Sequence, residues 1–147
     1  MYIRYMTLVT LKRIRVAQYG SEGGELEKAG IYILDFCRNM THGKMKSALD
    51  NIDYTTEPDA IGYDRKMGCK VLKEIYESTE PIKLIHNENM LGTNFVNYVY
   101  DINLGKHLLN IYKDNNIYSA PVLSFKLNNL PTNEEYVRCI HDQMSIV

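Results

Sequence analysis

The stretch from residue 2 to residue 19 constrains the fold most, because it is dense in Tyr, Ile, Val and Thr and contains neither Gly nor Pro. These side chains suit a pleated surface, so the stretch predicts β structure. Twofold alternation places the apolar residues up to Leu11 on one face, whereas those from Ile14 onwards fall on the other. We therefore expect a bulge or a turn near Lys12.

The rest of the chain mixes strand and helix signals. Residues 20–30, "GSEGGELEKAG", predict a loop because of their glycines and acidic residues. Thr132 and Glu135 have capping-box spacing, which predicts the start of a last helix. The other expected elements are a strand at 31–37, a helix after Thr41, a helix at 56–78, a strand at 81–86, a helix at 104–113 and a strand at 117–127. Residues 93–103 fit a strand and a helix equally.

These elements do not alternate regularly, and no linker or repeat divides the chain. We therefore expect residues 1–147 to form a single α+β domain, with a small mixed or antiparallel sheet and three or four helices. A chain of 147 residues is long enough to bury a core of its own.

Composition sets few limits on function. The formal net charge of -1 provides no global attraction to nucleic acid or to anionic lipid. No apolar run approaches the roughly 20 residues that span a bilayer, so we expect no membrane association. Three cysteines cannot all pair within one chain, which favours a reducing, cytoplasmic location. The many Asn and Tyr residues, with Lys in excess of Arg, suggest an AT-rich source such as a virus or phage.

Neither a metal site nor a cofactor site is predicted. The nearest Cys and His pairs, Cys37 with His42 and Cys139 with His141, lack the spacing of zinc ligands. No phosphate-binding or dinucleotide motif is present. A thiol enzyme using Cys37 and His42 remains an alternative, because Cys37 precedes a polar turn that contains this histidine. The sequence leaves open which cysteine, if any, is reactive.

Gly30, Ile31 and Tyr32 resemble the opening motif of the GIY-YIG nucleases. The resemblance implies a tyrosine on a strand beside a metal-bound phosphate. The second Tyr-x-Gly element and the helical arginine of that family have no counterparts here, so we interpret these residues as ordinary strand residues.

The first alternative, ahead of the thiol enzyme, is a nucleic-acid-binding or decayed nuclease-like domain. Four basic residues lie in the first predicted strand, where they could contact phosphates: Arg4, Lys12, Arg13 and Arg15. A charged edge strand that discourages aggregation explains the same pattern.

The hypothesis that we favour is a small, non-enzymatic viral or phage accessory protein that binds a protein partner or a second copy of itself. This hypothesis rests on the twelve tyrosines, which are more than one small core is expected to need. Tyr is enriched where proteins meet, so the additional tyrosines indicate a contact surface. The expected contact residues lie in the asparagine-rich second half: Tyr98, Tyr100, Tyr112 and Tyr118. Self-association would pair residues 2–19 or 117–127 at a sheet edge.

Overall fold

The computed structural model describes residues 2–62, 66, 68–92, 96–114 and 116–144. Within these residues the chain has a five-stranded mixed sheet, a two-stranded parallel sheet and four α-helices, which confirms the α+β prediction. The elements in order are β1 (Tyr5–Leu11), β2 (Arg13–Gly20), α1 (Ala29–Asn39), α2 (His42–Leu49), β3 (Ile52–Tyr54), η1 (Gly68–Lys70), α3 (Val71–Glu77), β4 (Ile82–Leu84), η2 (Glu88–Gly92), β5 (Tyr98–Asn103), β6 (Leu108–Lys113), β7 (Leu123–Lys126) and α4 (Asn133–Met144). No helix in this part of the chain is both long and apolar enough to cross a bilayer.

The first hairpin confirms the turn expected near Lys12. This residue alone links β1 to β2 and has a φ of 64°, in the left-handed region that permits a tight reversal. The register also shifts between Val9 and Thr10. Because of this bulge, Ile14 and Val16 pack on opposite faces of the sheet although they are two residues apart.

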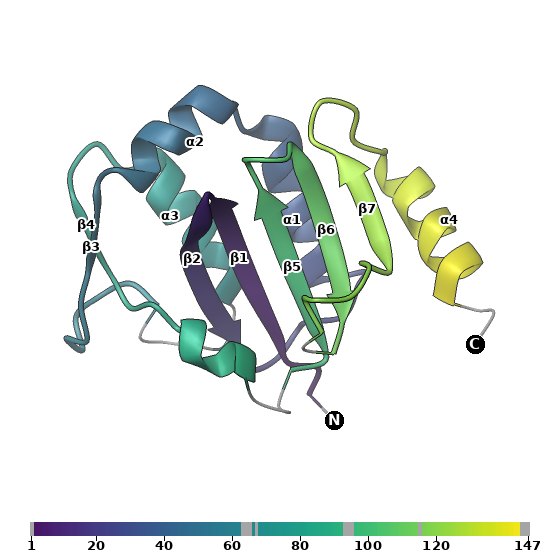
Figure 1. Ribbon diagram of the computed structural model, residues 1–147, viewed down its shortest axis with the longest axis horizontal. Helices are drawn as coiled ribbons and strands as arrows, with labels where there is room; N and C mark the ends of the chain where they lie inside the picture. The colour runs from purple at the N-terminus through teal and green to yellow at the C-terminus, as the bar shows by residue number, and fades with distance from the viewer. Residues whose placement is uncertain (1, 63–65, 67, 93–95, 115, 145–147) are drawn as a thin grey trace.

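The large sheet has the strand order β2-β1-β5-β6-β7. Only β1 and β5 pair in parallel, and a parallel pair needs a long crossover connection. The chain between them supplies this crossover and contains α1, α2 and α3. In Figure 1, α1 and α3 lie behind the sheet, α2 lies across its upper end and α4 lies beside β7, while the opposite face of the sheet is turned to the viewer. We call that opposite face the open face.

The main core lies between the sheet and the helices. Tyr5, Tyr100 and Tyr136 are fully buried there. Their hydroxyl groups bond within this core: Tyr100 donates to Gly24 O at 2.7 Å and Tyr136 donates to Leu26 O at 2.8 Å. These bonds satisfy carbonyl groups of the 20–30 loop, which otherwise could not be buried without cost.

A smaller apolar cluster covers the lower half of the open face. Met6, Leu8, Ala17, Val96 and Val99 are buried there. Side chains of η2 and of the connection between β6 and β7 pack against them, and both segments cross in front of the sheet in Figure 1.

The strand predicted at residues 31–37 is wrong, because α1 spans Ala29–Asn39. The buried residues recur at helical spacing, and the short apolar run alone did not distinguish a helix from a buried strand. They are Ala29, Gly30, Ile33, Leu34, Phe36 and Cys37. The strand-borne tyrosine of the nuclease resemblance is therefore also wrong, since Tyr32 lies in a helix.

The helix predicted at residues 56–78 is wrong over its first part. Ile61 N–H donates to Lys83 O at 2.9 Å, so this segment runs beside β4 instead. Gly62 has a φ of 93°, which a helix does not allow. Residues 63–65 and 67 lie outside the described residues, and α3 covers Val71–Glu77.

The helix predicted at 104–113 is also wrong, because β5 and β6 form an antiparallel hairpin. Residues 98–103 are a strand, while residues 93–95 lie outside the described residues. Three other predictions are confirmed by the helix after Thr41, by β4 and by the capping box. In that box, Thr132 N–H donates to the Glu135 carboxylate at 3.1 Å, and Glu135 N–H donates to Thr132 Oγ1 at 3.2 Å.

Candidate functional site

A row of polar side chains crosses the upper half of the open face. The register places Asp101 on β5 opposite Asn110 on β6, and Asn110 opposite Ser124 on β7. Thr10 on β1 donates its hydroxyl to Asp101 Oδ1 at 2.7 Å. Ser124 donates to Asn110 Oδ1 at 2.6 Å. Four strands therefore contribute to one continuous polar row.

Asp101 is the most unusual member of this row. It is only 7% exposed, and burial raises the pKa of its carboxyl to about 6. The Thr10 hydrogen bond and the positive charge of Lys106 lower this pKa and offset part of the burial effect. A buried carboxylate without a close cationic partner costs stability at neutral pH. Perturbed acids of this kind cluster at functional sites, which makes Asp101 the centre of the candidate site.

The connection between β6 and β7 borders the same face. Ile117 packs against the apolar cluster of the open face, together with Tyr112. The next residue, Tyr118, is 95% exposed. This exposed ring is available to a partner, since Tyr is enriched at protein interfaces.

The four predicted contact tyrosines do not form one surface. Tyr112 and Tyr118 lie on or beside the open face, as described above. Tyr100 is completely buried under the helices, so its assignment as a contact residue is wrong. Tyr98 is half-buried on the helix side and lines a hollow of about 330 Å³ with Leu26 and Ile140.

Most of the tyrosines that the structure describes are buried or are half-buried against an apolar cluster, so the number of tyrosines in the sequence no longer supports a tyrosine-rich surface. Among the described residues, the large hydrophobic side chains that are exposed are Tyr2, Tyr54 and Tyr118. The others that the structure describes are buried or half-buried. The sequence could not distinguish these cases, since a tyrosine suits a core as well as an interface when its hydroxyl finds a partner.

The four predicted basic residues are also separated. Arg4 precedes β1, whereas Lys12 and Arg13 lie at the far end of this strand. Arg15 turns towards α2, where its guanidinium donates to Leu49 O at 3.3 Å and lies 3.7 Å from the Asp50 carboxylate. Of the four, only Lys12 and Arg13 therefore lie next to each other on the exposed surface.

One of the two predicted sheet edges is already covered. Asn87 N–H donates to Ala17 O at 2.8 Å, and Tyr19 N–H donates to Asn87 Oδ1 at 3.2 Å. The chain around Asn87 therefore occupies the outer edge of β2, and pairing of residues 2–19 at this edge is wrong. The other edge strand of the sheet is β7.

The proposed thiol site lacks an activated cysteine. Cys37 is buried in α1, and this burial raises the pKa of its thiol to about 12. Almost no thiolate would exist at neutral pH. His42 instead stacks on His107, with ring centroids 4.6 Å apart. The described residues also contain no group of three or more His, Cys, Asp or Glu side chains that could hold a metal ion.

Sequence reasoning missed Asp101, Thr10 and Asn110. One signal was present: an aspartate interrupts the apolar run of "YVYDIN". A charged residue inside an otherwise buried strand contradicts the preference of such strands for apolar residues. Conflicts of this kind are expected at functional sites. Comparison with protein-family models, with curated proteins and with solved structures found no significant match.

Proposed function

We propose that this protein is a non-enzymatic binding protein that contacts a protein partner through the open face. The observation that carries this proposal is the polar row centred on Asp101, in the half of the face that no helix covers. Hydrogen-bonding groups fixed on adjacent strands form a rigid surface, which limits the entropy lost on binding. Tyr118 adds a large aromatic side chain at the border of this surface.

The polar row gives this surface specificity as well as area. A partner that covers Asp101 must supply a hydrogen-bond donor or a cation, because the carboxylate would otherwise lose its remaining water. Asn103 and Ser124 lie at the margin of the row and retain exposure to solvent. The expected contact is therefore a buried centre with a polar rim, as in other protein interfaces.

Site-specific photo-crosslinking tests this proposal. A photoreactive amino acid replaces Tyr118 or Ser124 on the open face, and Lys73 on α3 provides the control position. We expect the same adducts from both open-face positions in cells that express the protein, and none from position 73. Mass spectrometry identifies the partner, and analytical ultracentrifugation tests whether it is a second copy. Equal labelling at all three positions, or none, would contradict the proposal.

A further inference from the structure

Four segments meet at the end of the sheet where β1 finishes. Leu104 N–H donates to Thr10 O at 2.8 Å, which brings the β5–β6 turn beside the β1–β2 turn. The register also places Lys126, at the end of β7, opposite Leu108 at the start of β6. We call this end of the molecule, which residues 10–15, 42–50, 101–108 and 124–129 form, the apex.

Helix α2 lies across the apex. At its start, the ring of His42 stacks on the ring of His107 in the β5–β6 turn, with an angle of 22° between the rings. At its end, Leu49 O accepts the hydrogen bond from Arg15 on β2. Figure 1 shows α2 above the ends of the strands. The side chains of α2 therefore join those of the two turns in one surface.

The apex is strongly basic, although the chain as a whole is slightly acidic. Residues 10–15, 42–50, 101–108 and 124–129 contain seven Lys and Arg residues, and their only acidic residues are Asp50 and Asp101. Asp50 pairs with Arg15. In the part of the chain that the structure describes, no salt bridge neutralises the exposed cations of the apex, which are Lys12, Arg13, Lys44, Lys46, Lys106 and Lys126.

The stacked histidines lie close to two of these cations: the charge of Lys46 acts on His42, and Lys106 precedes His107 in the β5–β6 turn. Burial, His107 and Lys46 together lower the pKa of His42, since each disfavours a further positive charge. An anion bound near this position would reverse that effect. Charge complementarity therefore favours a polyanion as the occupant of the apex.

We propose that the apex binds the sugar–phosphate backbone of a nucleic acid. Basic side chains from separate turns match a ligand with regularly spaced charges. A lipid surface is the poorer fit, because membrane-binding helices insert an apolar face. The apolar residues of α2, Met45, Ala48 and Leu49, are buried in the core instead. This surface is distinct from the contact proposed for the open face, so either can fail alone.

Fluorescence anisotropy with a labelled DNA duplex and a labelled single strand of about 20 nucleotides tests the proposal. We expect binding that weakens roughly 100-fold between about 50 and 200 mM salt if about four duplex phosphates are contacted. The variant with Lys46→Glu and Lys106→Glu should lose at least about tenfold in affinity at low salt, and its salt dependence should be shallower.

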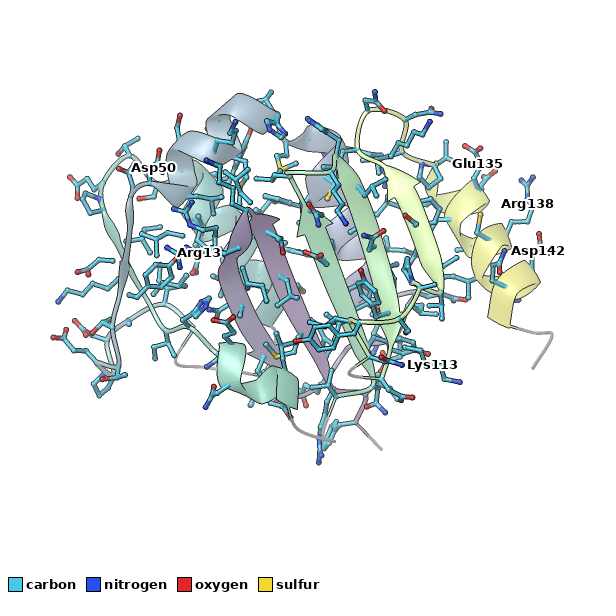
Figure 2. The ribbon with its side chains drawn as sticks, in the orientation of Figure 1. Arg13, Asp50, Lys113, Glu135, Arg138 and Asp142 are labelled. Carbon is cyan, nitrogen blue, oxygen red and sulfur yellow. The ribbon has the colours of Figure 1, made fainter. Side chains whose placement is uncertain are left out.

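The control variant carries Lys28→Glu and Lys113→Glu, which give the same change in net charge at the opposite end of the sheet. Figure 2 shows Lys113 at that lower end. We expect its affinity to change less than about twofold. Urea unfolding confirms that both variants fold, and Lys46→Ala with Lys106→Ala replaces the reversal variant if it does not. Absence of binding, equal losses in both variants, or preferential binding to phosphatidylserine vesicles would overturn the proposal.

Discussion

The two faces of the five-stranded sheet use similar polar side chains in opposite ways. On the helix side, Tyr5, Tyr100 and Tyr136 are buried, and each hydroxyl has a hydrogen-bond partner. On the open face, Asp101 is buried with a raised pKa, because the Thr10 hydrogen bond and the charge of Lys106 do not fully compensate for its desolvation.

This difference distinguishes side chains that stabilise the fold from side chains that are available to a binding partner. Buried hydroxyl groups that have partners stabilise a unique packing and leave nothing for a ligand. A buried carboxylate whose desolvation is only partly compensated keeps capacity for a further hydrogen-bond donor or cation. The helix side should therefore respond to substitution through stability, whereas the open face should respond through binding. Substitutions on the two faces test this contrast.

Gly30→Ala should have the largest effect on stability. An added Cβ at this position would clash with the Tyr136 hydroxyl oxygen and lie 3.3 Å from the Tyr100 ring. Such overpacking should lower the free energy of unfolding by roughly 2–3 kcal/mol in a urea titration. Gly43→Ala is the matched control in α2, where no atom lies within 4 Å of the added carbon, and it should stabilise the protein by up to about 1 kcal/mol. Equal effects at the two glycines would contradict the packing described for the helix side.

Asp101→Asn should stabilise the protein at neutral and alkaline pH. The pKa of Asp101 rises from 3.8 to about 6 on folding, so stability falls as the pH increases through this interval. We expect a gain of roughly 1–3 kcal/mol at about pH 8 that disappears below about pH 4, because the amide can still accept the Thr10 hydrogen bond. Urea titrations at several pH values measure this gain.

The exposed Asp142 provides the control for that experiment. Asp142→Asn should change the free energy of unfolding by less than about 0.5 kcal/mol at every pH. A loss of stability in Asp101→Asn at about pH 8 would show that the carboxylate is fully compensated, which would remove it as the centre of the candidate site.

Tyr5→Phe should have a smaller effect, on the helix side again. The Tyr5 hydroxyl accepts the Cys69 N–H at 3.1 Å and donates to Cys69 Sγ at 3.1 Å. Its removal leaves a buried N–H group without this acceptor, which should cost about 1–2 kcal/mol in thermal or urea unfolding. Tyr2→Phe, at a residue that is 68% exposed, is the control and should be neutral. Neutrality of both variants would mean that water replaces the missing hydroxyl.

Tyr118→Ala should change stability least, by less than about 0.5 kcal/mol, because the ring is almost fully exposed. Its expected effect is on binding: the crosslinks from position 124 on the open face should weaken or disappear. Unchanged crosslinking would show that this ring lies outside the contact surface, and a large loss of stability would assign it a structural role.

Local patterns predicted the elements that depend on neighbouring residues. The β structure of residues 2–19 with a bulge or turn near Lys12, the strand that contains residues 82–84 and the capping box of Thr132 with Glu135 all agree with the structure. The predictions failed where tertiary contacts decide between two local solutions. Residues 31–37 and 104–113 have apolar spacing compatible with either helix or strand, and packing against the sheet determines the outcome.

The candidate site was less predictable than the fold. Composition led to the choice of Tyr112 and Tyr118, which lie on or beside the open face, but also to the choice of Tyr100, which is buried. Asp101 and Thr10 are 91 residues apart in the chain, and only the parallel pairing of β1 with β5 brings their side chains together.

The sequence by itself determined that this chain forms an α+β fold, and that its start is β structure with a bulge or turn near Lys12, because side-chain alternation and turn propensities act over a few residues. Tertiary structure alone decided which tyrosines are buried, which face remains open and which lysines meet at the apex. Those outcomes depend on strand order and on burial, and burial is a property of the assembled molecule that no short segment encodes.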